Sequence, residues 1–570
     1  MKKYPMVWSI IGILLGISLV LVTIVFQDKS YQVIPRGSSS MMNNGMMWNE
    51  NNPMKEHWKM MTKMPGYEKY TQTNSSGGEE EYLNKKVLTD DSTTTDEKSN
   101  KVINLKNGDT YDLTIEKIRK TINGKSMIML SYNGSIPWPT IRIPKWSQIT
   151  LKVHNTVDGI ETTVHPHGLR LENQYDGVPK SQWGFQEPIK TWDTYEQKLK
   201  FPDAWLFWYH PHTRDDFEQE LGEYGTFLVY DPNEKRIFDT EQVIVLDDIL
   251  LEDGQIPEYS TDLVNHALMG RYGNTFLVNG RRDFSLSMNQ WEVKRLYFLN
   301  SANARPFRIS IPGIKMKLVG SDNGYFQNEK FIDNFIIAPA ERYIVDIYAD
   351  NGGTYPLTHQ GTGKPITLWN IIVSKTLAIA DTFKNDFHTL HTHQIMTDIT
   401  NLENYFSKAP DKNITLSMNM SWMSGMGNMG GMMNMGDSDT IEWDDTMSMM
   451  NEKSTDKSIT WQITDDATKK VNMDIDWNFQ KWSFVKIHIF NDPNTMHPMQ
   501  HPFHMHGQRF LVLDTNGKKN ENLAWKDTVL IPKWDTVDIL VDMSNPWTWM
   551  AHCHIVEHLL SGMMFSYSVK

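Results

Sequence analysis

The sequence predicts an all-β protein built from three consecutive Greek-key sandwich or barrel domains. Short runs of alternating or β-branched residues recur along the chain, for example at 149–153, 292–298 and 536–541. Gly, Pro, Asn and Asp residues separate these runs, as turns between strands require. The sequence has no long stretch of helical periodicity, and its 570 residues are enough for three or four domains.

The N-terminal part differs in texture from the rest. Residues 7–26 form an uncharged, mostly apolar stretch of 20 residues, about the length that a helix needs to cross a bilayer. Two lysines precede it, so the positive-inside rule leaves residues 1–6 in the cytoplasm and the main body outside. No small-residue cleavage pattern follows, which favours an uncleaved single-pass anchor in the cell membrane over a cleaved secretory signal. Residues 27–101 are polar, and we expect a disordered spacer that carries eight Met between 41 and 64.

Three domain-sized blocks follow, at 102–232, 242–374 and 391–570. Within the third block, the segment 418–450 holds eleven Met among Gly, Ser, Asn and Asp, a composition unlike that of a core strand. We therefore expect a Met-rich surface insertion over about 416–450.

Charge and cysteine content exclude some classes of protein. The formal net charge is −13 and there is no long basic run, so nucleic acid is not an expected partner. The single cysteine, Cys553, excludes a disulfide framework. A lone cysteine is usually a small buried apolar residue, but the neighbours of Cys553 indicate chemistry. A monomer is the simplest expectation.

Histidine gives the strongest signal, because ten of the 19 His fall into four short groups. Side chains alternate faces along a strand, so the two imidazoles of a His-x-His pair point the same way. Imidazole suits copper, and buried histidines would be unstable together without a metal. We expect pairs from the first and third blocks to converge on a three-copper cluster between the two domains. The groups are His165-Pro-His167, His210-Pro-His212, His501-Pro-Phe-His504-Met-His506 and His552-Cys553-His554-Ile-Val-Glu-His558.

The last group links two sites. Within 552–554 the cysteine must point away from the face of its two flanking histidines. Cys553, His501 and His558 provide the His₂Cys set of a blue-copper centre, with Met563 placed as the weak axial ligand. The backbone from Cys553 into the neighbouring histidines is the obvious path for electrons.

In this order, the four groups resemble the copper-binding signatures of the multicopper oxidases. The resemblance extends over about 102–570 and includes Pro137-Trp-Pro-Thr-Ile-Arg142, Phe276-Leu-Val-Asn-Gly280 and Asn545-Pro-Trp-Thr-Trp549. It implies three cupredoxin-like domains and a copper-dependent oxidoreductase. Such an enzyme couples the one-electron oxidation of a substrate to the four-electron reduction of O₂ to water.

The resemblance also implies how about four copper ions per chain are held. The type 1 copper takes a thiolate, two imidazoles and a thioether, and the cluster takes the eight remaining imidazoles. The implied ligands are His501, Cys553, His558 and Met563 for type 1; His165 and His504 for type 2; His167, His210 and His554 for one type 3 copper; and His212, His506 and His552 for the other.

Reduction of O₂ consumes protons, so acids near the cluster matter. Asp176 matches the acid that the family places there, although Asp176-Gly177 also reads as an ordinary β-turn. Bacterial members commonly carry a second acid directly after the second type 1 histidine, where this chain has Leu559. Glu557 is a substitute candidate for that role.

The substrate is decided by what covers the type 1 site. Thioethers prefer Cu(I), so the Met-rich segments favour a cuprous oxidase in copper tolerance. The alternatives are a laccase-type oxidase of phenols, pigments or Mn(II), a non-catalytic protein that sequesters copper, and, remotely, a copper nitrite reductase. The candidate Cu(I)-binding residues are Met499, Met418, Met420, Met423, Met426, Met429, Met432, Met433 and Met435.

Overall fold

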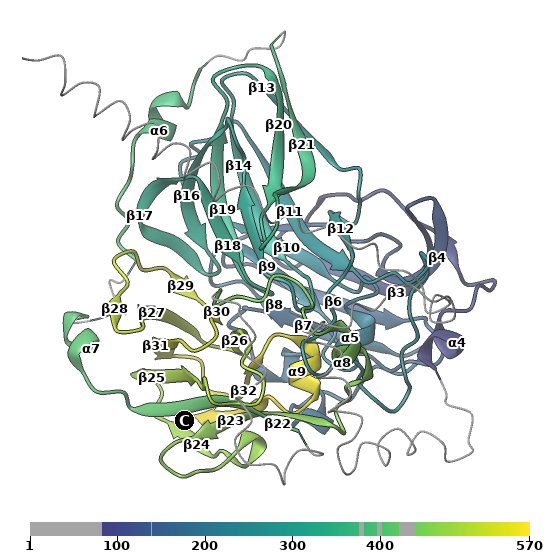
Figure 1. Cartoon of the computed structure of the whole chain (residues 1–570). Helices are drawn as coiled ribbons and strands as arrows, with labels where there is room; N and C mark the ends of the chain where they lie inside the picture. The colour runs from purple at the N-terminus through teal and green to yellow at the C-terminus, as the bar shows by residue number, and fades with distance from the viewer. Residues whose placement is uncertain (1–81, 138, 376–380, 396–398, 400–401, 421–438) are drawn as a thin grey trace, which may run out of the picture. The chain divides into compact units, whose positions relative to one another are not determined.

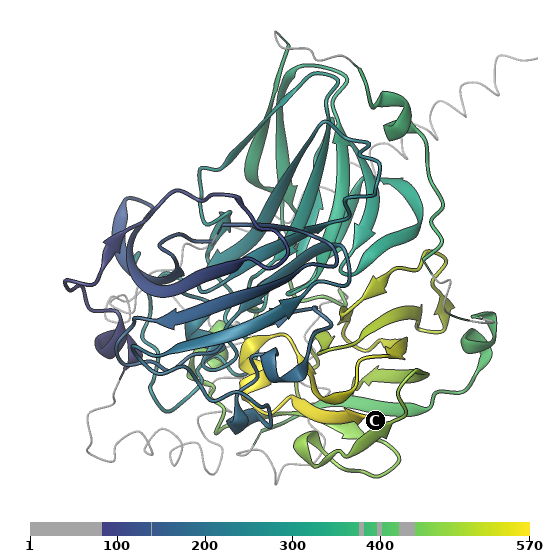
Figure 2. The ribbon, with the colours of Figure 1, turned by 180° about the vertical axis from the view of Figure 1, so that it is seen from behind.

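The described part of the protein is mostly β, as predicted. In this computed structural model six sheets are arranged as two sheets in each of three consecutive domains (Figures 1 and 2). The longest α-helix among the described residues has 6 residues, and no described helix is long and apolar enough to span a bilayer. The expected anchor at 7–26 lies outside the described residues. The structure describes residues 82–137, 139–375, 381–395, 399, 402–420 and 439–570.

The first domain is a two-sheet sandwich around an aliphatic and aromatic core. The first His-x-His segment forms β7 and the second begins at the last residue of β9, at one end of the strand order β2-β5-β10-β9-β7. The first sheet contains β1 (Thr95–Asp96), β3 (Thr110–Ile122), β4 (Lys125–Tyr132), β6 (Gln148–Asn155) and β8 (Thr194–Lys200), and the second contains β2 (Ile103–Asn104), β5 (Ile141–Pro144), β10 (Gly225–Tyr230), β9 (Trp205–His210) and β7 (His165–His167).

The expected spacer extends too far toward the first domain. Residues 82–101 belong to this domain, because α4 (Leu83–Val87) buries Leu83 and Val87 in its core. Strand β1 then pairs in parallel with β3. Most residues of 82–101 are polar. The few apolar residues do not form a periodic pattern from which a helix or strand could be predicted.

The second domain contributes no histidine to the four groups. A further apolar cluster that includes Trp205, Val243 and Leu277 packs the first domain against it. Its six-stranded sheet has the order β12 (Thr275–Val278), β11 (Thr240–Ile249), β14 (Val293–Asn300), β19 (Arg342–Tyr348), β16 (Lys315–Ser321), β17 (Gly324–Ile332), and its five-stranded sheet has the order β13 (Ser285–Asn289), β21 (Ile366–Ser374), β20 (Gly353–His359), β15 (Phe307–Ser310), β18 (Asn334–Ile337).

The third domain repeats the sandwich, and its second sheet carries the other two histidine groups on the neighbouring strands β26 and β32. The first sheet holds β22 (Lys412–Met420), β23 (Ile459–Asp465), β25 (Ser483–Asn491), β27 (Arg509–Thr515), β28 (Lys518–Lys519), β29 (Trp525–Lys526) and β31 (Thr536–Met543), and the second holds β24 (Trp477–Phe479), β26 (His501–Met505), β30 (Thr528–Ile531), β32 (Trp547–Cys553) and β33 (Met564–Val569).

Short helices connect these strands. In Figure 1, α5 and α9 lie beside each other between the strands of the first and third domains, and the two helices are in contact. The helices after α4 are α5 (Asp215–Glu218), α6 (Lys384–His388), α7 (Glu403–Ser407), α8 (Ser448–Lys453) and α9 (Val556–Leu560), with 3₁₀ turns at Asn173–Tyr175, Lys180–Gln182 and Asn472–Asp474.

The expected insertion at 416–450 differs from the structure at both of its described ends. Met418 and Met420 lie in β22, pair with β23 and are buried in the core of the third domain. In the sequence, Met418 and Met420 alternate with polar Ser417 and Asn419 and adjoin the Met-rich segment. The end of this strand was therefore assigned to the insertion. At the other end, residues 439–454, called the strap below, bury Ile441 and Trp443.

Hydrogen bonds fix the strap to two domains. Arg305 of the second domain donates to Asp444 at 2.6 Å, and Tyr272 donates to the Glu442 carbonyl at 3.1 Å. On the third domain, Lys533 donates to the Glu442 carboxylate at 2.9 Å. The strap is therefore part of the folded body. Met423, Met426, Met429, Met432, Met433 and Met435 lie outside the described residues.

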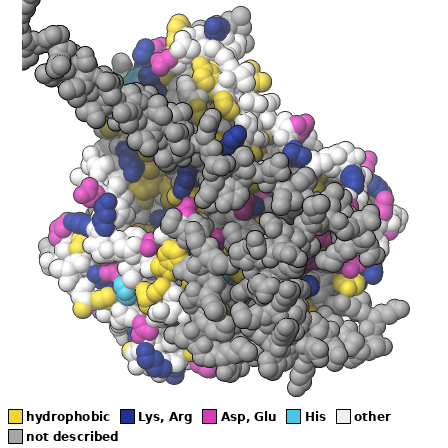
Figure 3. Space-filling model, viewed as in Figure 1, with side chains coloured by type: hydrophobic (Ala, Val, Ile, Leu, Met, Phe, Trp, Pro, Cys, Tyr) yellow, Lys and Arg dark blue, Asp and Glu magenta, His cyan; other side chains and the backbone are white. Residues whose placement is uncertain are grey.

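The described surface carries mixed charge. On the face shown in Figure 3, Lys and Arg side chains alternate with Asp and Glu over the described regions. This distribution agrees with the modest formal charge of −13 spread over 570 residues.

Candidate copper centres

The first four histidines project from two paired strands. In the β7–β9 ladder His165 lies opposite His210, and His167 lies opposite Trp208. His165 and His167 occupy alternate positions of β7, so their rings share one face. His212 follows β9 two residues after His210, and all four side chains are buried.

The third domain presents its groups in the same way. His504 lies opposite His552 in the β26–β32 ladder, and Phe503 lies opposite Cys553. Because faces alternate along a strand, the histidines at 504 and 552 share one face and the thiol of Cys553 lies on the other. All of these residues are buried.

The eight histidines of the two domains converge as expected. The rings of His167 and His504 stack with centroids 3.8 Å apart, and those of His165 and His506 lie 4.1 Å apart. Within each triad the nearest donor atoms lie within 4.8 Å of one another. The triads are His165, His167 and His504; His167, His210 and His554; and His212, His506 and His552.

In three histidines of the cluster, one ring nitrogen is hydrogen-bonded and the other has no partner in the part of the chain that the structure describes. His165 Nδ1 bonds the Asp176 carbonyl at 2.6 Å, His212 Nδ1 bonds Gln182 at 2.8 Å, and His504 Nδ1 bonds the Asp527 carbonyl at 2.8 Å. The Nε2 atom of each of these rings is buried without a partner among the described residues. Buried polar atoms are normally hydrogen-bonded, and metal-binding histidines use one nitrogen for the metal and the other for such a bond. The unpartnered nitrogens therefore fit metal donors.

Burial keeps these imidazoles neutral, which is the form that binds metal. Desolvation, together with neighbouring histidines, lowers the pKa of His554 to about 3 and that of His506 to about 4. Eight neutral nitrogen donors in one buried cluster suit copper.

A second donor set surrounds the thiol. Cys553 Sγ lies 3.5 Å from His501 Nδ1 and 3.9 Å from His558 Nδ1. Met563 is fully buried in the same core cluster, and its carbonyl accepts the Cys553 N–H at 3.1 Å. Burial raises the pKa of the Cys553 thiol, so a bound cation is needed to hold the thiolate. Two imidazoles and a buried cysteine match a blue-copper site.

Comparison with known proteins identifies the family. Three consecutive family models, each described as multicopper oxidase, match residues 114–234, 243–377 and 442–570. Each match coincides with one of the three sandwich domains.

The chain belongs to the multicopper oxidase family.

It is 25% identical over 449 residues to the multicopper oxidase mco of Staphylococcus aureus, which covers 76% of this chain and 82% of that protein. It is 28% identical over 302 residues to copper resistance protein A of Escherichia coli, which covers 44% of this chain and 48% of that protein. Among solved structures, a metallo-oxidase from Campylobacter jejuni matches with a TM-score of 0.63 and 22% identity over 86% of this chain and 98% of that chain. This multicopper oxidase therefore shares the family's copper-dependent oxidoreductase chemistry and its use of O₂.

Asp176 lies directly at the histidine cluster of this oxidase. Its Oδ2 accepts from His506 Nδ1 at 2.9 Å, and its Oδ1 lies 3.3 Å from His165 Nδ1. Burial opposes ionisation of Asp176, but the two facing histidines outweigh burial and hold its pKa below the usual range.

The other predicted acid lies at a junction of all three domains. Glu557 is fully buried, accepts from Asn303 at 3.4 Å and faces Arg271. Burial raises its pKa to about 7 against the attraction of Arg271. Leu559, at the position of the missing second acid, packs with Val178 and Met550 in a small apolar cluster.

Sequence reasoning missed two residues of the sites. Trp461 stacks on His558 with ring centroids 4.0 Å apart and meets His501 edge-on at 4.9 Å. Asp527 contacts both His167 and His504. Neither lies in a histidine motif, and a single Trp or Asp in a β-rich sequence carries no signal of its own.

Proposed function

We propose that this oxidase takes its electrons from Cu(I) and serves in copper tolerance. Bound copper would supply one-electron transfer at the Cys553 site and reduction of O₂ at the histidine cluster. The observation that carries the proposal is the burial of the type 1 imidazoles, since His501 is 1% exposed and His558 is 0% exposed. A bulky phenol needs access to the edge of such a ring, whereas a small cation needs only donor atoms that lead to it.

The residue assignment supports this reading of the two centres. We assign His501, Cys553 and His558 to the type 1 copper on the donor distances given above, and the buried Met563 of the same core as the fourth ligand. The three histidine triads are assigned to the type 2 and type 3 coppers, with His167 in the type 3 set and His165 and His504 on type 2.

Soft donors pack against the core that contains the type 1 residues. Met447 and Met450 of the strap, together with Met496, pack against the core cluster that contains Cys553 and Met563. Met269 contacts the strap through the Thr446 hydroxyl, 4.0 Å from its sulfur. Thioether sulfur prefers Cu(I), so this layer suits passage of that ion.

His497 adds a nitrogen donor to this layer. It is buried, and its Nε2 has no hydrogen-bond partner among the described residues. Burial lowers the pKa of His501, and the neighbouring His497 contributes to the same shift. Met499, two residues further on, is fully buried in the same cluster. The names of two relatives, copper resistance protein A and a metallo-oxidase, agree with a metal substrate.

The acids complete the proposal. Asp176, in contact with His506 and His165, is placed to hold and pass a proton at the cluster. Glu557 is the second candidate donor, because burial holds its pKa near neutrality. The apolar stretch at 7–26 supports an anchored body outside the cytoplasm, where copper tolerance would act.

Separate rates for Cu(I) and for a bulky phenol test the choice of substrate. One variant replaces residues 421–438 by a Gly-Ser linker of the same length, so that no residue of β22 or the strap is changed. A second carries Met447→Leu and Met450→Leu, which keep the side-chain volume and remove the sulfur. Met288→Leu, in the core of the second domain, is the matched control.

We expect kcat/KM for Cu(I) to fall about tenfold or more in both test variants while the phenol rate holds or rises. The control should match wild type for both substrates. Unchanged Cu(I) oxidation in both test variants would contradict the Cu(I) assignment and favour a laccase-type oxidase. Loss of both activities together with copper would instead mean that the centres themselves were damaged.

A further inference from the structure

In His167 the hydrogen-bonded ring nitrogen is Nε2, the reverse of the arrangement in His165, His212 and His504. Its Nε2 lies 3.2 Å from Asp527 Oδ1 and 3.2 Å from the Thr528 hydroxyl. Its Nδ1 is buried without a partner among the described residues. In His165, His212 and His504 the free nitrogen is Nε2 instead. This arrangement requires the ring proton of His167 to be on Nε2. The Asp527 carboxylate is the charged acceptor that can hold it there.

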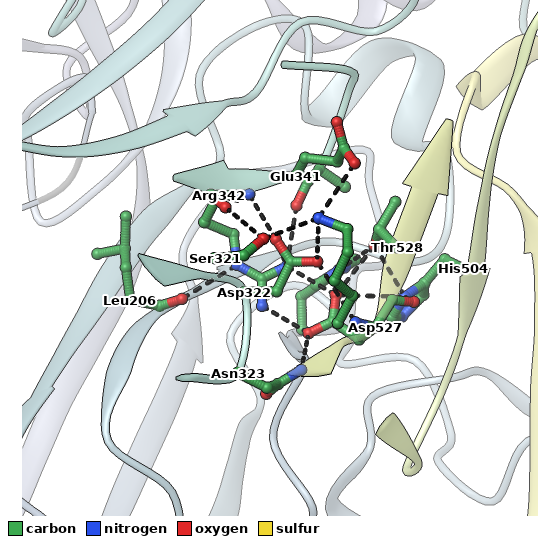
Figure 4. Close-up of polar contacts among 12 residues, drawn as sticks. Leu206, Ser321, Asp322, Asn323, Glu341, Arg342, His504, Asp527 and Thr528 are labelled. Carbon is green, nitrogen blue, oxygen red and sulfur yellow. Dashed lines mark hydrogen bonds and ion pairs between the residues drawn. The ribbon is translucent and has the colours of Figure 1, made fainter. Parts of the chain in front are cut away.

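The second domain holds Asp527 in place (Figure 4). Arg342, at the start of β19, donates from Nη1 to Oδ1 at 2.7 Å and from Nη2 to Oδ2 at 2.5 Å. Asn323 donates to the same Oδ2 at 2.7 Å. Both Arg342 and Asp527 are fully buried, so this two-point ion pair is shielded from water.

The surrounding residues are arranged around this pair. A Cβ added at Gly168 would overlap Asp527 Oδ2 and would lie 2.8 Å from Arg342 Nη2, which explains the glycine after the first His-x-His pair. Asp322 accepts the Arg342 backbone N–H at 2.7 Å and pairs with Lys526 at 3.1 Å. Asp322 thus shares the buried network with Asp527, but its hydrogen bonds and ion pairs within the described residues include no histidine.

We propose that Asp527, clamped by Arg342, is a positioning residue of the cluster that fixes the tautomer of His167. The carboxylate accepts a hydrogen bond from the Nε2–H of His167. The unprotonated Nδ1 is then the nitrogen that can bind copper. The second domain, which supplies none of the histidines of the four groups, would in this way control one ligand of one type 3 site.

The test compares three variants by copper content, blue absorption and the EPR signal of the cluster. Asp527→Asn keeps the shape but weakens the acceptor and its pairing with Arg342. Asn323→Ala loosens Asp527 without leaving a buried charge unpaired, which guards against a variant that fails to fold. Asp346→Asn is the matched control, because it alters a different buried two-point pair of the second domain, with Arg295 at 2.7 and 3.0 Å.

Loss of a supporting hydrogen bond to a ligand typically costs about 10- to 100-fold in metal affinity. We expect Asp527→Asn, and to a smaller extent Asn323→Ala, to lose cluster copper and change its EPR signal while the blue band stays. Asp346→Asn should keep the copper content and cluster signal of wild type. Full copper and an unchanged cluster signal in a folded Asp527→Asn or Asn323→Ala variant, or an equal effect in Asp346→Asn, would overturn the proposal.

An independent observation concerns tryptophan in turns. Five turns of four described residues lead into a strand and have Trp as their third residue, with φ between 67° and 71°. In each of them the last N–H donates to the first carbonyl at 2.9–3.3 Å. Type II turns require positive φ at this position, which favours glycine. The turns are 144–147, 190–193, 289–292, 480–483 and 532–535.

The same chain fills equivalent turns with small residues. Gly108 before β3 and Gly313 before β16 have φ of 89°, and Ala340 before β19 has φ of 68°. Burial does not compensate for the strain, since Trp146 is 72% exposed and Trp482 is 70% exposed. A left-handed conformation costs roughly 1–2 kcal/mol for a residue with a Cβ. The buried Trp208, Trp461 and Trp549 are not among the positive-φ residues.

We infer that the cell in which this protein is made reads the codon at these turn positions as glycine. This requires UGA, rather than UGG, at the turn positions and UGG at buried positions such as 208, 461 and 549. Tandem mass spectrometry of the protein isolated from its own cells, together with the codons of its gene, tests the inference. Glycine masses at the turns with tryptophan at the buried positions are expected, and tryptophan in the native turn peptides would overturn it.

Discussion

His504 and His552 lie directly opposite one another on the neighbouring strands β26 and β32. The next pair of the same ladder, Phe503 and Cys553, turns the thiol to the opposite face. A slip of one residue would exchange the faces, so this register fixes the thiol on one copper centre and the flanking imidazoles on the other. The pairing of β26 with β32 therefore fixes the positions of both centres relative to each other.

Removing His504 should damage the cluster and leave the thiolate site intact, because the two sites use opposite faces of the strands. In His504→Gln we expect copper content to fall by about one ion per chain or more while the blue absorption persists. His488→Gln is the control, since His488 is a partly exposed histidine of the same domain that bonds Asp538. Loss of the blue band in His504→Gln, or retention of all copper, would contradict the assignment.

The turn after the third histidine group has no room for a side chain. Gly507 has φ +68°, and an added Cβ would overlap the ring of Trp549. Gly507→Ala should lower the free energy of unfolding by about 3 kcal/mol or more, since backbone strain and overpacking add.

Gly108→Ala is the matched control for Gly507→Ala. Gly108 has φ +89° with nothing within 4 Å of an added Cβ, so only the backbone cost of about 1–2 kcal/mol should appear. Chemical denaturation measures both changes. Equal losses in the two variants would show that the contact with Trp549 is unimportant.

Buried acids of the first domain should make stability depend on pH. Burial raises the pKa of Glu218 from 4.5 to about 7, and burial with the neighbouring Glu218 raises that of Glu223. A carboxyl with a raised pKa in the folded state stabilises the protein fully below its unfolded pKa. That stability is lost as the pH rises through the folded value.

Glu223→Gln replaces the carboxyl by a neutral side chain of the same shape. We expect its melting temperature to exceed that of wild type by on the order of 2 °C or more at pH 8, with a smaller difference at pH 5. Thermal melts at the two pH values measure the difference. A larger gain at pH 5 than at pH 8 would contradict a raised pKa for this buried carboxyl.

Local patterns were enough to predict the β-sandwich fold and the grouping of the histidines with the cysteine. The alternation of faces on a strand is a local property, so His165-Pro-His167 and His552-Cys553-His554 reveal their orientation without the rest of the fold. The order of the four groups then implied which domains meet at the cluster. The anchor at 7–26 and the oligomeric state stay predictions.

Contacts between distant segments could not be predicted in the same way. Asp527 reaches His167 across 360 residues, and the strap meets Arg305 of another domain. Such pairings depend on domain packing, for which one sequence holds no periodic signal. The prediction that Met418 and Met420 belong to a surface insertion was wrong for a related reason. Methionine occurs in loops, metal sites and cores alike, so its presence does not indicate which of them it occupies.

Copper content and absorption of Cys553→Ser beside wild type test the central claim, that one strand serves two separate centres. We predict that wild type binds about four copper ions and is blue, and that the variant loses about one ion and the blue band but keeps the copper and EPR signal of the cluster. A variant that stays blue, or wild type that is colourless and metal-free after copper loading, would contradict the account.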